Sequence, residues 1–194
     1  MLAPLAITAH GWFLFNSMLV TVFVPFALLR LHLSAFELGI TLAAAGAGGL
    51  LGSLFSARLG MRWGAGRVVI ACRALMPLAW AIIAAVPSSD QGSPYWSTIV
   101  LVGAGQFLYG LAIGIENANE MGYRQAVTPD ALQSRMNTTM RSVNRAMIVV
   151  GAPVGGLLPD AIGYRPMLWI ATAGFVLVAV DLAASPFRHA RHGD

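Results

Sequence analysis

Four charged residues, spaced as two pairs, are the first candidates for chemistry in this sequence. Glu116 and Glu120 are four residues apart, and so are Arg141 and Arg145. Residues with this spacing share one face of a helix. Ionisable groups that border hydrocarbon are usually paired or functional, so the two pairs indicate either a static ion network or a cytoplasmic gate that opens and closes. A static network is the commoner arrangement at the edge of a membrane, and both interpretations stay open.

Polar residues deeper in the apolar stretches are candidates for the wall of a binding cavity. Asn16, Gln106 and Asn117 could hydrogen-bond a substrate. A hydrogen bond between helices explains Asn16 and Gln106 equally well. Asp181 is a candidate proton carrier, with a paired or water-exposed acid as the alternative. Arg73 also falls inside an apolar run, where its long side chain is expected to snorkel toward water.

Signatures of enzymes and metal sites do not occur. The sequence contains neither the HExxH zinc pattern nor the GxSxG nucleophile elbow. His189 and His192 are three apart in a basic tail, and such tails are more often solvated than metal-bound. Cys72 is the one cysteine, so no disulfide can form within the chain. We therefore predict no enzymatic activity, no metal and no cofactor.

The composition predicts that a bilayer is part of the solvent of this chain. Of its 194 residues, 57% are hydrophobic and 10% are charged, and the mean hydropathy is +0.71. Soluble domains carry about 25% charged residues. The net charge of +4 comes from twelve basic residues, all arginines that mostly separate apolar runs. This pattern favours signals for membrane topology over nucleic-acid binding.

Apolar runs predict an all-α membrane protein with six transmembrane helices, because a spanning helix needs about 20 residues. Its first run lacks the basic start of a signal peptide. The connections are predicted to be short, except the one before the fifth helix. There Thr128 is expected to be the N-cap and Pro129 the first helical residue, so the fifth helix is predicted to begin outside the hydrocarbon and climb into it. The expected spans are Leu5–Leu29, Leu38–Leu59, Val68–Val86, Trp96–Ile115, Asn137–Pro159 and Pro166–Pro186.

The distribution of arginines predicts the orientation of these helices. Placing the N-terminus in the cytoplasm leaves two arginines outside, Arg30 and Arg165, and nine inside. Arginine is enriched in cytoplasmic loops, so we predict a multi-pass protein of the inner (plasma) membrane with both termini in the cytoplasm. The tryptophans and tyrosines near the span ends, Trp80 among them, are expected to form an interface belt. The nine arginines predicted to lie on the cytoplasmic side are Arg58, Arg62, Arg67, Arg124, Arg135, Arg141, Arg145, Arg188 and Arg191.

Glycines spaced four apart indicate close helix packing and an internal repeat. Such pairs let a neighbouring backbone approach closely. When the chain is shifted by 103 residues, the pair Gly48/Gly52 falls on the pair Gly151/Gly155. By the same shift, Gly60 falls on Gly163 and Arg62 falls on Arg165. Gly60 and Gly163 are each expected to form the turn after a span. The three pairs are Gly48 with Gly52, Gly110 with Gly114, and Gly151 with Gly155.

A repeat of this length covers three helices, so its second copy enters the membrane from the opposite side. Inverted repeats of this kind are typical of secondary transporters. We therefore predict one transmembrane domain, residues 1–188, made of two inverted three-helix repeats over about 1–87 and about 95–188. A cytoplasmic tail is expected over residues 189–194.

Longer stretches of the sequence resemble the major facilitator superfamily, in particular the carboxyl-terminal half of its drug and siderophore exporter-like branch. The resemblance rests on Tyr123-Arg124-Gln125-Ala126-Val127-Thr128-Pro129-Asp130 and on Gly151-Ala152-Pro153-Val154-Gly155-Gly156. It also rests on Ala57-Arg58-Leu59-Gly60-Met61-Arg62, which is similar to the family's cytoplasmic loop motif except that Ala57 stands where an Asp is usual. We accordingly group Arg58 and Arg62 with the candidate gate.

The resemblance implies half of a major facilitator fold, helices seven to twelve of twelve. Its expected activity is the ion-gradient-driven export of small amphipathic molecules by alternating access, with a small-molecule substrate, the lipid bilayer and a second six-helix half as partners. That second half would be a separate chain or another copy of this one, because the sequence has the length of one half. The alternative is a stand-alone six-helix structural or regulatory protein, or a truncated remnant without function.

Overall fold

The computed structural model describes residues 2–88 and 95–190, and their regular structure is helical. Six of the helices are long and apolar enough to cross a membrane, which confirms the predicted fold class. A short 3₁₀ helix, η2 (Pro186–His189), follows them. The six are α1 (Leu2–Leu29), α2 (Ala35–Trp63), α3 (Ala65–Ala85), α4 (Tyr95–Val127), α5 (Asp130–Ile162) and α6 (Tyr164–Ala184).

Local sequence explains where several helices begin and end. The hydroxyl of Ser34 accepts the backbone N–H of Glu37, whose carboxylate accepts the backbone N–H of Ser34, and this capping box starts α2. Gly64 and Gly163, with φ of +84° and +92°, are the single residues that separate α2 from α3 and α5 from α6. Other residues rarely adopt this backbone conformation, so glycine permits each abrupt change of direction.

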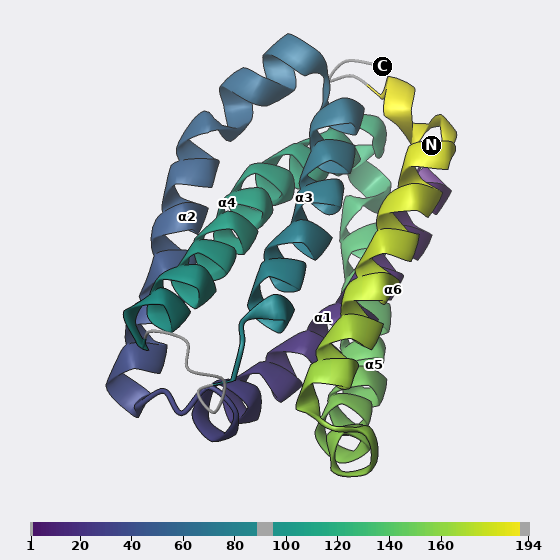
Figure 1. Cartoon of the computed structure of the whole chain (residues 1–194). Coiled ribbons are helices and arrows are strands. Elements are labelled where there is room, and N and C mark those ends of the chain that lie inside the picture. Colours follow the sequence, from purple (N-terminus) through teal and green to yellow (C-terminus); the bar gives the residue numbers. More distant parts are fainter. Residues whose placement is uncertain (1, 89–94, 191–194) are drawn as a thin grey trace.

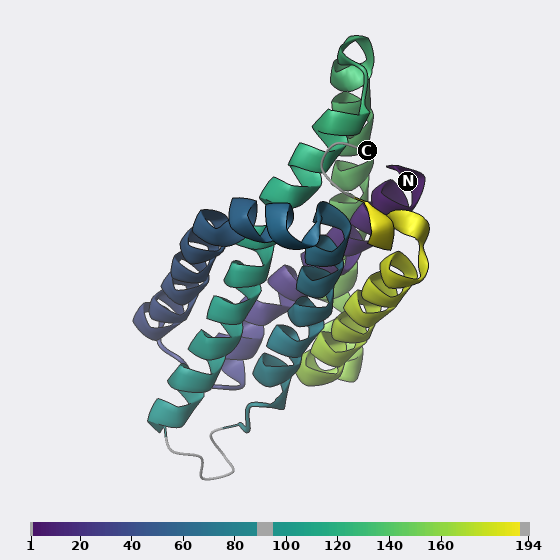
Figure 2. The ribbon, with the colours of Figure 1, turned by 90° about the horizontal axis from the view of Figure 1, so that it is seen from above.

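The fifth helix begins at Asp130, outside its apolar run, as the Thr128-Pro129-Asp130 pattern predicted, but the connection before it is short. Thr128 and Pro129 alone separate α4 from α5, and Pro129, not Thr128, is the N-cap. The hydroxyl of Thr128 instead contacts the sulfur of Met136 at 3.1 Å. Hydropathy finds only the part of a helix that lies in hydrocarbon. The helices α4 and α5 both continue beyond their apolar runs as polar helix. Figure 2 shows the resulting hairpin projecting beyond both described ends of the chain.

The six helices pack in the same pattern when the first three are exchanged for the last three. α2 packs mainly on α4, as α5 packs on α1, and α3 packs on α4 as α6 packs on α1. α3 and α6 pack on each other (Figure 1). An inverted repeat generates this pattern, with α1, α3, α4 and α6 in the centre and α2 and α5 on the flanks. Exact boundaries of the two repeats stay a prediction.

The glycine pairs lie where the flanking helices touch the central ones. A Cβ on Gly48 would overlap the carbonyl oxygen of Phe107, and one on Gly151 would lie 2.5 Å from the carbonyl oxygen of Leu14. Gly52 and Gly155 repeat these contacts one turn later, against Leu111 and Met18. Gly110 and Gly114 lie in the same interface and approach the backbone of Ala45 and Gly49.

The glycine turns of the two repeats do not match as the sequence shift predicts. Gly60 lies within α2, and the turn falls one helical turn later, at Gly64. Arg62 is consequently in the last turn of α2, whereas Arg165 is in the first turn of α6, so the two arginines are not structural equivalents. The packing glycines keep register because they touch backbone, while the polar end of a helix can lengthen into water.

The hydrophobic core lies between the central helices and includes Phe26, Trp80 and Phe175. Trp80 is 1% exposed, so its assignment to an interface belt was wrong. A second cluster around Leu5, Tyr123 and Phe187 closes the end of the bundle that carries both described chain ends. The expected tail is partly packed there, because Ala190 is buried and its carbonyl accepts the backbone N–H of Gly66 at 3.0 Å. Residues 191–194 lie outside the described part of the chain.

Replacing Gly48 by alanine should destabilise the protein, because the new methyl group would collide with the α4 backbone. Overpacking typically costs about 1–3 kcal/mol. Gly46→Ala, two residues earlier in α2, is the matched control: a Cβ there meets nothing within 4 Å. Thermal unfolding in detergent should show a lower midpoint for Gly48→Ala and an unchanged or slightly higher one for Gly46→Ala. Equal midpoints would contradict this description of the α2–α4 contact.

Candidate functional site

A buried ion-pair network joins α3 to α4 near the end of the bundle that holds both described chain ends. The guanidinium of Arg73 in α3 donates to Glu116, and its Nη2 donates to Glu120 at 3.2 Å. Glu120 also accepts from Arg124, one turn further along α4, at 3.4 Å. Arg73 and Glu116 are both 3% exposed. The four side chains therefore form an alternating row of charges along one face of α4.

Arg73 is held from α1 as well as from α4. Its Nη1 donates to the carbonyl of Thr8 at 3.1 Å, and its guanidinium carbon lies 6.0 Å from the ring centre of Trp12. The ring N–H of Trp12 in turn donates to the sulfur of Met76, which follows Arg73 by about one turn of α3. A charge taken out of water is costly unless it is paired and hydrogen-bonded, and here two helices, α1 and α4, supply the partners. The expectation that Arg73 snorkels to water was therefore wrong.

One oxygen of the network has no partner. Among the described residues, Oε2 of Glu116 is buried and accepts no hydrogen bond. It belongs to a side chain that lines a cavity of about 340 Å³ between α1, α4 and α5. The cavity wall combines apolar rings with amides and charges, and it includes Trp12, Phe13, Ile113, Asn117, Arg124 and Asn144. An unsatisfied carboxylate oxygen at such a wall is a place for a proton or a hydrogen-bond donor to bind.

Amide side chains connect this region to α5. Nη2 of Arg124 donates to Asn137 at 2.9 Å, and Nδ1 of His10 shares a hydrogen bond of 2.7 Å with the side-chain oxygen of Asn144. These contacts link α4 and α1 to the polar first half of α5. In the described ranges, no cluster of three or more His, Cys, Asp or Glu side chains could hold a metal ion.

The residues of the candidate gate do not come together as the sequence suggested. Glu116 and Glu120 pair with Arg73 and Arg124, and not with Arg141 or Arg145. The reason is that α5 packs on α1 and makes little contact with α4. The four arginines assigned to the gate are all exposed, and no ion pair is formed by any of them within the described chain: Arg58, Arg62, Arg141 and Arg145.

Of the residues predicted to line a cavity, Asn117 lies in the wall described above, while Asn16 and Gln106 do not. Asn16 accepts a hydrogen bond from the hydroxyl of Tyr109, and Gln106 is 3% exposed. The interhelical alternative therefore describes Asn16 correctly. Asp181 is exposed near the end of α6 and is absent from this wall. Its role as a proton carrier has no support from the geometry.

Arg73 is a buried member of this ion-pair network that the sequence did not assign to a site. The signal was present, because a charge in the middle of an apolar run needs an opposite charge from another helix, and Glu116 is the acid that directly follows the fourth run. Choosing that partner required knowing that α3 packs on α4, which sequence spacing does not give. Glu116 was instead matched with arginines at a similar depth.

Six spanning helices arranged as an inverted repeat define a multi-pass membrane protein with the architecture of half a secondary transporter. A sequence model of the Major Facilitator Superfamily matches residues 5–193, which is nearly the whole chain. The chain belongs to this superfamily.

The sequence is also similar to the "Uncharacterized MFS-type transporter YceJ" of Bacillus subtilis (strain 168). The two are 24% identical over 157 residues, which cover 81% of this chain and 36% of the relative. The chain thus spans about a third of the length of this curated relative.

A double-mutant cycle should reveal the coupling between Arg73 and Glu116. Arg73→Met leaves Glu116 buried without its main partner, and Glu116→Leu weakens the pairing of Arg73, so each should cost about 3–5 kcal/mol. The double variant removes both charges and leaves Glu120 with Arg124. It should recover about 2 kcal/mol or more of the summed loss, measured by unfolding in detergent.

The exposed Arg58 supplies the control for this cycle. Arg58→Met should change stability by less than about 0.5 kcal/mol. Strictly additive effects of the Arg73 and Glu116 substitutions would contradict the buried pair.

Proposed function

We propose that this chain forms half of a transporter that moves small amphipathic molecules across the membrane by alternating access. The observation that carries the proposal is the cavity at Glu116, whose charged and amide groups lie within helices otherwise suited to hydrocarbon. Polar groups at membrane depth are costly and typically line solute or ion pathways. Membership of the superfamily supports the same function.

The lining of the cavity fits a molecule with both apolar and polar parts. Trp12, Phe13 and Ile113 provide an apolar surface, while Asn117 and Glu116 provide hydrogen-bonding groups at its edge. The drug and siderophore exporter-like resemblance of the sequence agrees with such a substrate, and we propose export as the direction.

Glu116 is the residue we propose to couple transport to a proton gradient. A proton bound at Oε2 would neutralise the carboxylate that faces Arg73 and leave Glu120 as the main counter-ion of that guanidinium. Because Glu120 is one turn nearer the end of α4, this exchange of partners would favour a different position of α3 along α4. Release of the proton on the other side would restore the first arrangement. Movement between two such arrangements is what alternating access requires.

We propose that a second six-helix half completes the substrate pathway. α2 and α5 are the least buried of the six helices and expose many apolar side chains, among them Leu50, Leu54, Val149 and Leu157. The cavity wall carries charged and amide groups, which are costly where they face lipid. A second half, whether a separate chain or another copy of this one, would cover both surfaces.

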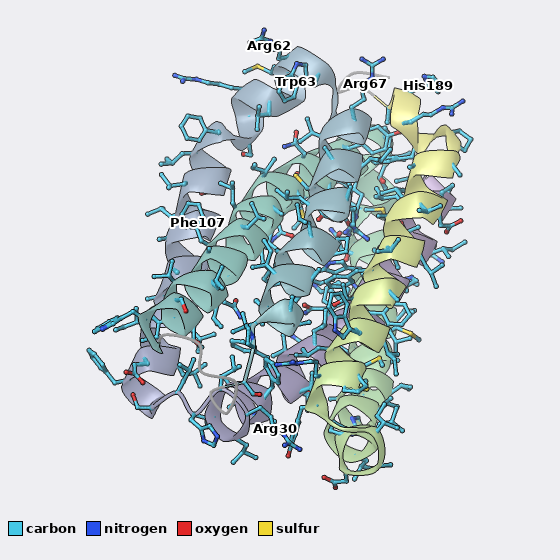
Figure 3. All side chains as sticks on the ribbon, viewed as in Figure 1. Arg30, Arg62, Trp63, Arg67, Phe107 and His189 are labelled. Atoms are coloured by element: carbon cyan, nitrogen blue, oxygen red, sulfur yellow. The ribbon has the colours of Figure 1, made fainter. Side chains whose placement is uncertain are left out.

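The charges at the two ends of the bundle support an orientation with both termini in the cytoplasm. We propose that the membrane is the inner (plasma) membrane. Figure 3 shows Arg62, Arg67 and His189 at the end that carries the termini, and Arg30 at the opposite end. The arginine-rich end is the one expected to stay inside.

Transport can be tested in vesicles that hold this chain together with a second six-helix half, using ethidium as a fluorescent amphipathic probe. An imposed pH gradient should drive ethidium flux, and Glu116→Gln should reduce that flux to background because its amide cannot bind a proton. Glu37→Gln is the control, since Glu37 caps α2 far from the cavity. Its flux should match that of the unaltered chain.

Two results would speak against the proposal. Flux that persists unchanged in Glu116→Gln would remove the coupling role from this residue. Absence of flux for ethidium and for a panel of other amphipathic solutes, with every partner half tried, would favour a stand-alone structural protein.

A further inference from the structure

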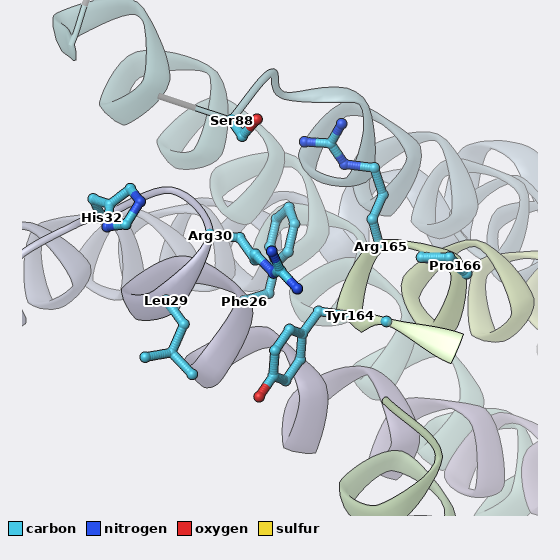
Figure 4. Close-up of a pocket in the computed structure, with 9 residues that line it drawn as sticks. Phe26, Leu29, Arg30, His32, Ser88, Tyr164, Arg165 and Pro166 are labelled. Atoms are coloured by element: carbon cyan, nitrogen blue, oxygen red, sulfur yellow. The ribbon is translucent and has the colours of Figure 1, made fainter. Parts of the chain in front are cut away.

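A second cavity, of about 530 Å³, lies at the end of the bundle opposite the described chain ends. It is formed where α1 ends, where α3 has ended and where α6 begins. Figure 4 shows Arg30 and Arg165 extending into this space from two different elements, with His32 and Ser88 at its rim. The proposed transport function makes no use of this cavity.

The cavity concentrates positive charge. Arg30 and Arg165 are the two arginines that the described chain places at this end, and both line the same cavity. The described lining contains no Asp or Glu. Of the acids that lie near the lining residues in the sequence, Glu37 is held by Ser34, Asp160 is exposed and outside the lining, and Asp90 lies outside the described residues. Two guanidinium groups that share a cavity without an acid repel each other unless an anion lies between them.

Aromatic rings and a carbonyl hold the two guanidinium groups. Arg165 donates through Nη2 to the carbonyl of Val86 at 2.6 Å, and its guanidinium carbon lies 5.8 Å from the ring centre of Phe26. The guanidinium carbon of Arg30 lies 5.8 Å from the ring centre of Tyr164. Stacking on a ring leaves the N–H groups at the edge of a guanidinium available. Each arginine therefore keeps donors for a ligand.

The start of α6 also borders this cavity. Tyr164 and Arg165, the first two residues of the helix, are part of the lining. The first N–H groups of a helix have no partner within it, and the helix dipole favours negative charge at this end. The helix start and the two guanidinium groups therefore both favour a negatively charged ligand.

We propose that this cavity binds a phosphate group, with the phosphodiester of an anionic lipid headgroup as its source. Guanidinium groups bind phosphate oxygens through paired, charge-assisted hydrogen bonds. The ends of spanning helices lie at the depth of lipid headgroups. Leu29, 57% exposed beside the arginines, gives the cavity an apolar edge along which an acyl chain can run. Free inorganic phosphate offers the same phosphate oxygens but has no acyl chain to lie along that apolar edge.

Native mass spectrometry of the full chain in detergent tests the proposal. Phosphatidylglycerol should give bound adducts that phosphatidylcholine with the same acyl chains does not give. The double variant Arg30→Gln/Arg165→Gln should bind at least about tenfold less phosphatidylglycerol, because it loses both charges and the charge-assisted hydrogen bonds that they donate. The control Arg62→Gln/Arg188→Gln removes two exposed arginines from the opposite end and should bind like the unaltered chain.

Equilibrium dialysis with radiolabelled inorganic phosphate distinguishes the two sources. Saturable phosphate binding that needs Arg30 and Arg165, without preference for the anionic lipid, would assign the site to a soluble phosphate and overturn the lipid source. If the glutamine double variant does not fold, Arg30→Lys and Arg165→Lys keep the charge and lose the paired donors, so weaker adducts are expected. Adducts that are equal in all folded variants, or absent from the unaltered chain with both probes, would overturn the proposal.

Discussion

The rest of this structure depends on the need to neutralise one guanidinium group inside a membrane-spanning bundle. Arg73 is in the third of six apolar helices and is 3% exposed. Its charge is tolerated because α4 supplies two carboxylates and α1 supplies a carbonyl and an aromatic ring. Each of these contacts fixes how far one helix lies along another. The pairing thus sets the register of three central helices and creates the cavity wall at Glu116.

The position of the flanking helices, α2 and α5, depends on glycines that let their backbones contact the backbones of α4 and α1 directly. Gly48 on α2 and Gly151 on α5 touch the backbones of Phe107 and Leu14, so these two residues occupy equivalent places in the repeats. Asn16 is two positions after Leu14, as Tyr109 is two positions after Phe107. They are therefore equivalent too, and they hydrogen-bond each other. Two equivalent residues in contact lie at the pseudo-two-fold axis, which places this bond at the centre of the bundle.

The two repeats also differ in their charges. Thr172 occupies in α6 the place that Arg73 has in α3, counted from Gly163 and Gly64 respectively. The inverted repeat is thus symmetric in packing and asymmetric in chemistry. The charged network lies on one side of the axis, toward the end with the termini, and the arginine-lined cavity lies at the other end. The bundle therefore has one wall that carries charged and amide groups and flanks that expose apolar side chains.

Sequence alone determined the membrane class, the six helices, the packing glycines and the superfamily, because hydropathy, small-residue spacing and local motifs are properties of single segments. Only the tertiary structure decided which charges meet. Arg73, Glu116 and Glu120 come from helices whose contact is not encoded by spacing, and Arg141 was matched with them wrongly because depth in the membrane does not fix lateral neighbours. The same holds for Arg30 and Arg165, which are 135 positions apart in the chain and share a cavity through the packing of α1 beside α6.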